Sequence, residues 1–507
     1  MSDRFVARGI DKVWLYEKPD TGAKRVDLRW GDYLNVESQD DTWTKVRWGK
    51  KSRWVLTENV AKTRPVEVIF VDVGQGDGCL FVSAETGKEE RIMVIDAGVG
   101  TNMFRFLNWR FGKFKKRFDF HAAIITHPDS DHYRGFGSLF NNRNVYFDHV
   151  YHNGIMEYAR GPALGPSDGR LLTGLMLDDQ TMRTHLSVDE NIVSESGKSK
   201  AFPKMLKGAM ESNRVRDFSM VSTEHGEKNG DGKCWLPGFS PDSGRSASLR
   251  VLGPVVEAAS DGSAGLRWFG DNIESRARNV GKTKNGHSVL LKMEVGNLSL
   301  LFGGDLNSPA EDFLLRHYSK KSDGPLTETV AGASKIFGCD IMKCCHHGSA
   351  DVTDEFLRAV SPFAFVVSSG DEESHAHPRP DLLGRLGKQG RGDAPLILCT
   401  EILRSTREKG VSADFVQLRK LDKAIDERPE AATLRNLQRK RREIQKRIER
   451  RNVGVYGAIT LRTDGDHMEV SFMLEKPRTH RDATTRWQRY HFEYVDGKGW
   501  VGELGEH

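Results

Sequence analysis

Long apolar runs and cysteine pairs are scarce in this 507-residue chain. No stretch approaches the roughly 18 apolar residues that a membrane helix needs, and the first residues contain no apolar signal core. The six cysteines show no C-x-x-C spacing, and most lie in apolar runs where a thiol packs as a small hydrophobic group. These absences argue against a membrane span and a disulfide framework, so we expect a cytoplasmic protein.

An excess of charge of one sign is also missing. The chain has 76 lysines and arginines against 71 aspartates and glutamates, which gives a formal net charge of +5. Composition alone therefore gives little support for a polyanionic partner. The chain is too long for one hydrophobic core, so we expect two to four domains.

Residues 1–62 alternate short strand patterns with polar turns. They resemble the bacterial src-homology-3-like (SH3-like) β-barrel, whose signature is matched here by Gly31, Asp32, Tyr33, Val36, Trp43, Lys45, Val46, Arg47, Trp54 and Val55. Such modules bind peptides, cell-wall glycans or a neighbouring domain. We interpret Trp43 and Trp54 as core residues, and Trp30 and Trp48 as candidates for a binding face.

Long apolar strands that end in glycine and aspartate begin at about residue 67. Strand and helix patterns alternate up to about residue 400, which is typical of an α/β layered domain. Residues 150–285 are richer in Gly, Ser and Asp, and we predict a loop-rich insert there. Residues 401–507 follow, with a basic helical hairpin interrupted by Pro429 and with β-hairpins around two D-G turns.

Two histidines and two aspartates fall within six consecutive positions of the segment THPDSDHYRG, directly after the strand-like run HAAIIT. They are His127, Asp129, Asp131 and His132. Asp305 follows a second apolar strand, and His346 and His347 follow a third. Imidazole and carboxylate ligands together suit zinc, manganese or iron(II), so the pattern predicts a site for one or two divalent ions.

These segments, in this order, resemble the metallo-β-lactamase fold and, within it, the ComEC-type branch of competence-protein DNA-uptake hydrolases. Seven blocks over roughly residues 67–390 carry the resemblance: FVDVGQGDGCL, VIDAG, THPDSDHYRG, NGHSVLLKM, LLFGGD, HHGS and SSG…HAHP. The resemblance implies an α/β architecture, an αββα sandwich of two packed sheets flanked by helices. The site would lie where the strand-end loops converge.

The resemblance also implies roles for the ligands. One ion would be held by His127 and Asp129 with His346 or His347. A second ion, or the substrate, would be served by Asp131, His132 and His377, and Asp305 would bridge the two ions. Aspartate at position 129 favours manganese as well as zinc. A one-ion site is the alternative, and His152 is a further candidate ligand.

A metal-activated water would then attack a phosphodiester. We expect Asp131 to orient or deprotonate this water, and His347 or His377 to neutralise charge or protonate the leaving oxygen. Ser349 and Ser368 each follow a strand, so they could contact phosphate, but capping of a turn is the competing interpretation.

The glycine-rich segment DVGQGD lacks the lysine and Ser/Thr of a nucleotide-binding P-loop, which disfavours an ATPase. We expect instead a tight turn beneath the metal site, with Asp72 or Asp96 holding a ligand histidine.

Two basic stretches bear on the substrate. Between Arg435 and Arg451, nine basic residues stand against two glutamates, a local charge of nine minus two, or +7. Clustered Lys and Arg are typical of nucleic-acid binding, with a solvated helix face as the alternative. Residues 102–120 interleave basic and aromatic residues; a helix covering the sheet explains most of the phenylalanines, while residues 113–117 could line the cleft. The candidate substrate contacts are Lys113, Lys116, Asn285, Ser288, Ser349, Arg441 and Arg442.

Two classes of function follow. The first is a metal-dependent phosphodiesterase or nuclease that hydrolyses DNA, with a small signalling nucleotide as the nearest competing substrate. The second is a binding scaffold with a vestigial hydrolase core, which recruits protein partners through the N-terminal barrel or the helical hairpin; a homo-oligomer is a further option. Acyl hydrolysis shares the fold, but nothing indicates an apolar acyl pocket. The architecture suggests a stand-alone bacterial nuclease in defence against foreign DNA.

Overall fold

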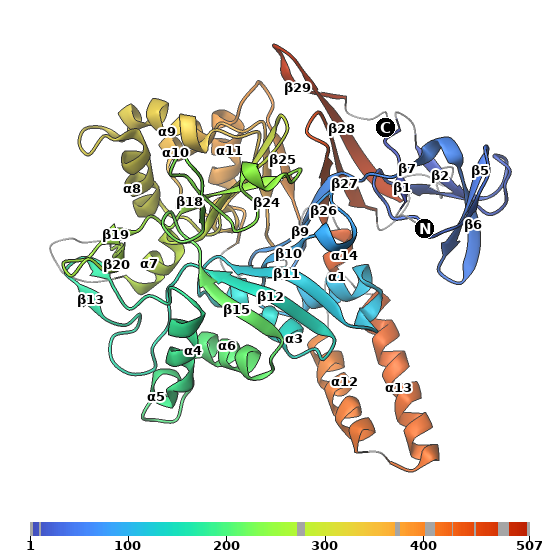
Figure 1. Cartoon of the computed structure of the whole chain (residues 1–507), viewed down its shortest axis with the longest axis horizontal. Coiled ribbons are helices and arrows are strands. Elements are labelled where there is room, and N and C mark those ends of the chain that lie inside the picture. The colour runs from blue at the N-terminus through green and yellow to red at the C-terminus, as the bar shows by residue number, and fades with distance from the viewer. Residues whose placement is uncertain are drawn as a thin grey trace.

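The computed structural model describes residues 4–9, 12–270, 279–370, 376–400, 411–427, 429–450, 453–474 and 486–503. Two large β-sheets occupy the centre of the molecule, with helices outside them (Figure 1). A small β-rich unit lies at one end, and the helical hairpin α12 (Val411–Asp426) and α13 (Ala431–Arg450) projects from the body (Figure 1). Within the described ranges, no helix combines the length and the apolar character that a bilayer crossing requires.

The first large sheet has ten strands and combines segments from distant parts of the chain. In spatial order they are β15 (Val215–Met220), β12 (Val145–His152), β11 (Phe118–Ile125), β10 (Ile92–Ala97), β9 (Gly78–Val82), β8 (Val66–Phe70), β26 (Ile459–Thr463), β27 (His467–Met473), β28 (Trp487–Val495) and β29 (Gly499–Glu503). Strands β10, β11, β12 and β15 are parallel, and β26 pairs antiparallel with β8. The C-terminal strands therefore complete this sheet instead of forming a unit of their own after residue 400.

The second sheet has eight strands, four of them parallel. In spatial order they are β16 (Glu227–Lys228), β17 (Cys234–Trp235), β18 (Ser248–Gly253), β21 (Leu290–Val295), β22 (Leu298–Phe302), β23 (Ile341–Lys343), β24 (Ala364–Val367) and β25 (Leu396–Cys399). Helices α8 (Ser308–Ser319), α9 (Val330–Phe337), α10 (Asp354–Val360) and α11 (Pro380–Gln389) pack on this sheet through a shared apolar cluster.

Strand alternation explains why the central strands are apolar at almost every position. In β11, Ala122 and Ile124 join a cluster that is shared with the second sheet, whereas Ala123 and Ile125 join a cluster that is shared with helices. Successive side chains of a strand point to opposite faces, so a strand covered on both sides reads as one apolar run. The two sheets thus share one core, and each has a further core on its outer face.

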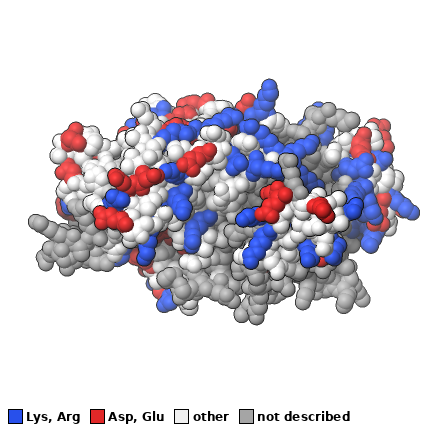
Figure 2. Space-filling model, turned by 90° about the horizontal axis from the view of Figure 1, so that it is seen from below, with Lys and Arg blue, Asp and Glu red and all other residues white. Residues whose placement is uncertain are grey.

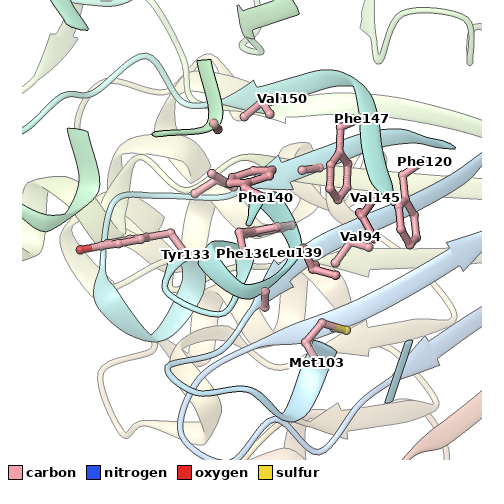
Figure 3. Packing of buried hydrophobic residues seen from close by; sticks show 14 of the residues in the cluster. Val94, Met103, Phe120, Tyr133, Phe136, Leu139, Phe140, Val145, Phe147 and Val150 are labelled. Carbon is pink, nitrogen blue, oxygen red and sulfur yellow. The ribbon is translucent and has the colours of Figure 1, made fainter. Parts of the chain in front are cut away.

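The helix-covered face of the first sheet is rich in phenylalanine. Phe136 and Phe140 of α3 (Phe136–Phe140) lie close to Phe147 of β12, and Phe120 stacks on Phe147 with ring centroids 5.0 Å apart (Figure 3). Phe106 of α1 (Asn102–Arg110) is in the same cluster, as expected for a helix that covers the sheet. Because α3 directly follows the THPDSDHYRG segment, this packing anchors the metal-ligand motif to the sheet.

The region predicted as a loop-rich insert is more ordered than its composition suggests. Strands β15 and β18 belong to the two large sheets, and α4 (Asp179–Ser187) and α6 (Ala201–Glu211) bury Met182, Leu186, Phe202 and Leu206 in the first sheet's outer core. A small four-stranded sheet lies between them in sequence, formed by β13 (Ser167–Asp168), β14 (Leu171–Leu172), β20 (Ala264–Arg267) and β19 (Glu257–Ala258). Gly, Ser and Asp there form turns between short elements.

The N-terminal unit has its own small apolar core around Leu15, Val46 and Val55. Its five-stranded antiparallel sheet runs in the order β3 (Arg25–Leu28), β2 (Val13–Tyr16), β6 (Lys51–Leu56), β5 (Trp43–Trp48) and β4 (Val36–Gln39), with β1 (Phe5–Val6) paired to β7 (Val60–Ala61). Trp43 and Trp54 are half-buried, and Trp48 is 40% exposed. The SH3-like assignment stays a prediction.

Candidate metal centre

The carboxyl ends of strands from both large sheets meet at the candidate metal centre. Asp96 lies near the end of β10, and the loop after β11 leads into α2 (Ser130–Tyr133), which carries Asp131 and His132. Asp305 follows β22, and His347 follows β23. The described chain therefore brings residues separated by more than 200 positions into contact.

Three donor atoms converge at the centre. The Oδ2 atom of Asp305 lies 3.2 Å from the Nε2 atoms of both His132 and His347, and the two Nε2 atoms are 3.3 Å apart. Asp131 Oδ2 is 3.5 Å from His347 Nε2. Ligands about 2.1 Å from a tetrahedral ion are separated by about 3.4 Å. The spacing of these four donors fits a single divalent ion.

Each imidazole is held from behind by a buried carboxylate. Asp96 Oδ2 is 2.8 Å from His132 Nδ1, and Asp77 Oδ1 is 2.9 Å from His347 Nδ1. Such contacts fix the ring and turn its Nε2 atom toward the centre. Asp77 offers an oxygen within 4.8 Å of the other donors, but this oxygen faces Nδ1, and Lys343 pairs with the second one. Asp77 therefore orients His347, whereas Asp131 faces the ligand side.

The backbone around these side chains takes conformations that are rare for residues other than glycine. Asp96, His346 and His347 have φ values of 53°, 49° and 54°. Such left-handed geometry costs on the order of 1–3 kcal/mol per residue and is common at functional sites. Gly76 lies against the backbone of Asp131, where a Cβ atom would overlap the carbonyl oxygen. The DVGQGD segment thus forms the tight turn beneath the site.

The charges of the centre are strongly coupled. Burial opposes charge on His132 and His347, but the neighbouring carboxylates outweigh it and raise both pKa values well above the ordinary range. Burial likewise disfavours the charged form of Asp305, yet His132, His347 and His346 hold its pKa well below the ordinary range. The carboxylates thus stay ionised and require a compensating positive charge, which either protons or a bound divalent cation supply.

A second group of donors lies on the other side of Asp305. His127 Nε2 is 3.7 Å from Asp129 Oδ2 and 4.0 Å from Asp305 Oδ2. Burial lowers the pKa of His127 to about 3, so its ring is neutral. In the described part of the chain, buried His127 Nε2 and Asp305 Oδ1 have no hydrogen-bond partner. Lys284 forms an ion pair with Asp129 on this side.

A polar cavity of about 450 Å³ opens over the centre. Its walls include Tyr133, Glu157, Lys284, Asn285, His346 and His377, together with Asp131 and Asp305. The ring of His377 lies 5.9 Å from that of His346 and 6.4 Å from that of His347. A reacting group in this cavity would meet the donor cluster and several polar side chains at once.

The structure favours His347 over His346 as the ligand. His346 Nε2 lies 3.8 Å from Asp305 Oδ2, and its side chain is 29% exposed. Both ring nitrogens of His347 face other groups of the centre, so His347 is poorly placed as the proton donor proposed from sequence. His377 remains at the cavity wall for that role. Residues 371–375 of the same block lie outside the described residues.

Several expected substrate contacts lie elsewhere. Lys113 and Lys116 precede β11, whereas the site follows it; eight residues of strand separate the two by roughly 25 Å. They do not line the cavity. Arg441 donates from Nε to Asp422 of α12 and so joins the two hairpin helices. Arg442 is exposed on α13, and Arg451 lies outside the described residues.

The serines near the site support the backbone. Ser288 Oγ donates to the Asn285 carbonyl and accepts from the Asp305 amide. Ser349 Oγ accepts from the Asp351 amide, and Ser368 Oγ donates to the Gly76 carbonyl. These contacts agree with the turn-capping interpretation. His152 accepts from the Gly154 amide and does not line the cavity.

Sequence reasoning missed Asp77, Lys343, Lys284 and Glu157 as parts of the site. Asp77 lies in the glycine-rich block, but only the fold shows that it meets His347. The signal available for Lys284 was its position beside Asn285, within a block that was already singled out. Asp96, by contrast, was one of two candidates for holding a ligand histidine, and it contacts His132.

Fold and site together define a mixed α/β protein with several sheets and a buried cluster suited to a divalent cation. No family model matches the chain. It is 28% identical over 183 residues to Competence protein ComA of Neisseria gonorrhoeae, covering 35% of this chain and 23% of that protein. It is 28% identical over 102 residues to ComE operon protein 3 of Bacillus subtilis, covering 20% of this chain and 11% of that protein.

The chain therefore spans less than a quarter of the length of these curated relatives. Both matches agree with the resemblance to the competence-protein branch. Among solved structures, a mutant of CmlA beta-hydroxylase is similar at 10% identity and a TM-score of 0.29, covering 78% of each chain. This likeness is too low to support any argument about fold or function.

Proposed function

We propose that the protein is a metal-dependent phosphodiesterase that hydrolyses DNA. The observation that carries the proposal is the convergence of His132, His347 and Asp305 at ligand spacing, with Asp131 beside them and a polar cavity above. Buried, mutually contacting donors of this kind would be costly to keep without a cation. This argues against a vestigial core that serves only as a scaffold.

The four donors would hold one divalent ion, with zinc and manganese as the candidates for this mixed nitrogen and oxygen set. A bound ion would supply the Lewis acidity that brings the pKa of water toward about 7. Asp131 faces the cavity from the ligand side. Burial works against its charge, but contact with His347 keeps its pKa well below the ordinary range, so it would orient a water as an acceptor and not act as a strong base.

His377 would donate the proton to the leaving oxygen. It is a cavity-wall imidazole close to His346 and His347. Asn285 and Lys284 lie at the same cavity and would meet the substrate's polar oxygens. The sequence makes DNA the preferred substrate because the matched relatives are competence proteins and the resemblance is to DNA-uptake hydrolases.

The hairpin α12–α13 supports a polyanionic substrate. Arg435, Lys440 and Arg442 are exposed on α13. Figure 2 looks at the molecule from below and shows Lys and Arg side chains over much of this face, with groups of Asp and Glu among them. Exposed cations on a projecting helix would contact phosphates while the centre cuts.

The test is hydrolysis by metal-free protein reloaded with manganese or zinc, on single-stranded, double-stranded and plasmid DNA and on the generic ester bis(p-nitrophenyl) phosphate. The proposal expects metal-dependent cleavage of DNA that is lost in Asp305→Asn and His132→Ala. Absence of cleavage by reloaded, folded protein on all four substrates would contradict it and favour the scaffold.

A small signalling nucleotide is the second candidate substrate. The cavity of about 450 Å³ has the size of a small-ligand pocket. Turnover of nucleotides and of the generic ester without cutting of any DNA would favour this alternative. The polar lining gives no support to an apolar acyl substrate.

A further inference from the structure

Lys284 lies where a second cation would lie in a two-ion centre. The His127 and Asp129 side chains stand on the opposite side of Asp305 from His132 and His347 and would be the start of a second ion site. The third member of this group is an ammonium, because Lys284 Nζ forms an ion pair with Asp129 Oδ1. Among the residues lining the cavity, this is the cation nearest to that side of the centre.

The lysine is built into its place. Its Nζ atom also lies 3.2 Å from Glu157 Oε1 and 3.3 Å from the Pro128 carbonyl oxygen, and its side chain is 12% exposed. An ammonium has three hydrogens, and Asp129, Glu157 and Pro128 provide three acceptors. The group is therefore satisfied where it is, and moving it would leave two carboxylates without their shared partner.

The second oxygen of Asp129 is engaged as well. With the Asn285 amide oriented so that its nitrogen faces acceptors, this nitrogen donates to Asp129 Oδ2 over 2.8 Å and to the Gly281 carbonyl over 3.0 Å. Both carboxylate oxygens thus accept from donors of this chain. A divalent ion at this position would lose Asp129 as a ligand and would lie beside a like charge.

We propose that the centre holds one divalent ion, bound by His132, His347, Asp305 and Asp131, and that the Lys284 ammonium supplies the positive charge on the His127–Asp129 side in place of a second ion. The inference rests on the proposed metal dependence but not on the identity of the substrate. It assigns Lys284 as the residue that sets the number of ions.

The experiment is a count of bound manganese. Metal-free protein is dialysed against excess manganese, and bound metal per chain is measured by elemental analysis, with the electron paramagnetic resonance spectrum reporting isolated or coupled ions. We expect about one ion and an uncoupled spectrum for the wild type, and a second ion with spin coupling in Lys284→Met. The control Lys282→Met, two positions away on α7 (Val280–Gly286), keeps one ion.

A second variant keeps the inference testable if Lys284→Met fails to fold. Asp129→Asn should still bind one ion, because Asp129 is not a ligand in the one-ion centre, whereas a two-ion centre would lose one. Two ions in the wild type, one ion in folded Lys284→Met, or a loss of metal in Asp129→Asn would overturn the inference while leaving the hydrolase proposal intact. No bound ion in the wild type would overturn both.

Discussion

At the scale of single residues, the centre depends on carboxylates that touch no ion themselves. Asp96 and Asp77 hold the Nδ1 atoms of His132 and His347, and this contact decides which way each ring faces. Asp77 also neutralises the buried Lys343. Replacing Asp77 would therefore disturb two groups, whereas Asp96 offers a cleaner test.

Asp96→Asn should weaken manganese binding by about 10–100-fold, because the amide no longer fixes and polarises His132 as a carboxylate does. Competition with a chelator of known affinity measures the effect. The matched control is Asp217→Asn, which alters a carboxylate 3.2 Å from His149 Nδ1, away from the cavity. Equal losses in both variants would refute an orienting role for Asp96.

Glu311 carries a prediction about pH. Burial raises its pKa to about 8, so the folded protein keeps a proton that the unfolded chain releases above about pH 4.5. Its contribution to stability is present at low pH and is lost as the pH rises through 8, with a limit of about 5 kcal/mol. Glu311→Gln does not titrate, so it should melt increasingly above the wild type between pH 5 and pH 9. A difference in melting temperature that is constant with pH would contradict this.

The ligands could be predicted from sequence because each follows a strand within a short, recognisable block. His127, Asp129, Asp131 and His132 share one segment, and the structure brings Asp131 and His132 to Asp305. The choice between His346 and His347 could not be made, because neighbouring residues in a left-handed turn diverge in ways that sequence does not encode. The role of Lys284 depends on Glu157 and Pro128, which only the folded chain brings near it.

At the scale of elements, the hairpin α12–α13 separates charges that stabilise it from charges that are exposed. Arg441 contacts Asp422 and joins the two helices, whereas Arg435, Lys440 and Arg442 are exposed. Sequence gave all of these residues the same interpretation, since a run of basic residues does not reveal which of them face the partner helix. Lys113 and Lys116 were misplaced for a related reason, because the length of β11 carries the chain away from them.

The triple variant Arg435→Glu, Lys440→Glu and Arg442→Glu should weaken DNA binding by at least about tenfold at 0.1 M salt and lower the salt dependence by about one unit per lost phosphate contact. Hydrolysis of the generic ester should not change, because the hairpin does not line the cavity. Fluorescence anisotropy over a salt series measures the binding.

A control with the same charge change separates a local effect from one of net charge. Lys198→Glu, Lys204→Glu and Lys335→Glu alter exposed lysines outside the hairpin. An equal loss of affinity in this control would show that total charge, and not α13, determines binding.

At the scale of the whole molecule, the N-terminal unit is fastened to the ten-stranded sheet by buried ion pairs. Arg462 of β26 is 1% exposed and contacts Glu67 of β8 and Asp32 of the N-terminal unit. Arg29 stacks over Trp487 of β28 at 3.7 Å and donates to Thr460. The N-terminal unit therefore packs through specific polar contacts against strands from both ends of the chain.

Arg462→Met should destabilise the protein by about 3–5 kcal/mol, because it leaves Glu67 and Asp32 buried with fewer partners. Urea unfolding followed by tryptophan fluorescence measures the change. Arg53→Met removes an ion pair with the exposed Glu17 within the N-terminal unit and should have little effect. Similar stability losses in both variants would show that the buried network is not the main fastening.

The pairing of β8 with β26 has a consequence for how the chain is made. Residues 66–70 emerge from the ribosome almost four hundred residues before residues 459–463, which they need as their neighbour in the sheet. During that interval the edge of β8 is open, and its side chains are among the most apolar of the protein. Vectorial synthesis thus leaves the nascent polypeptide dependent on chaperones until its last strands arrive, and expression of residues 67–400 alone would yield aggregates.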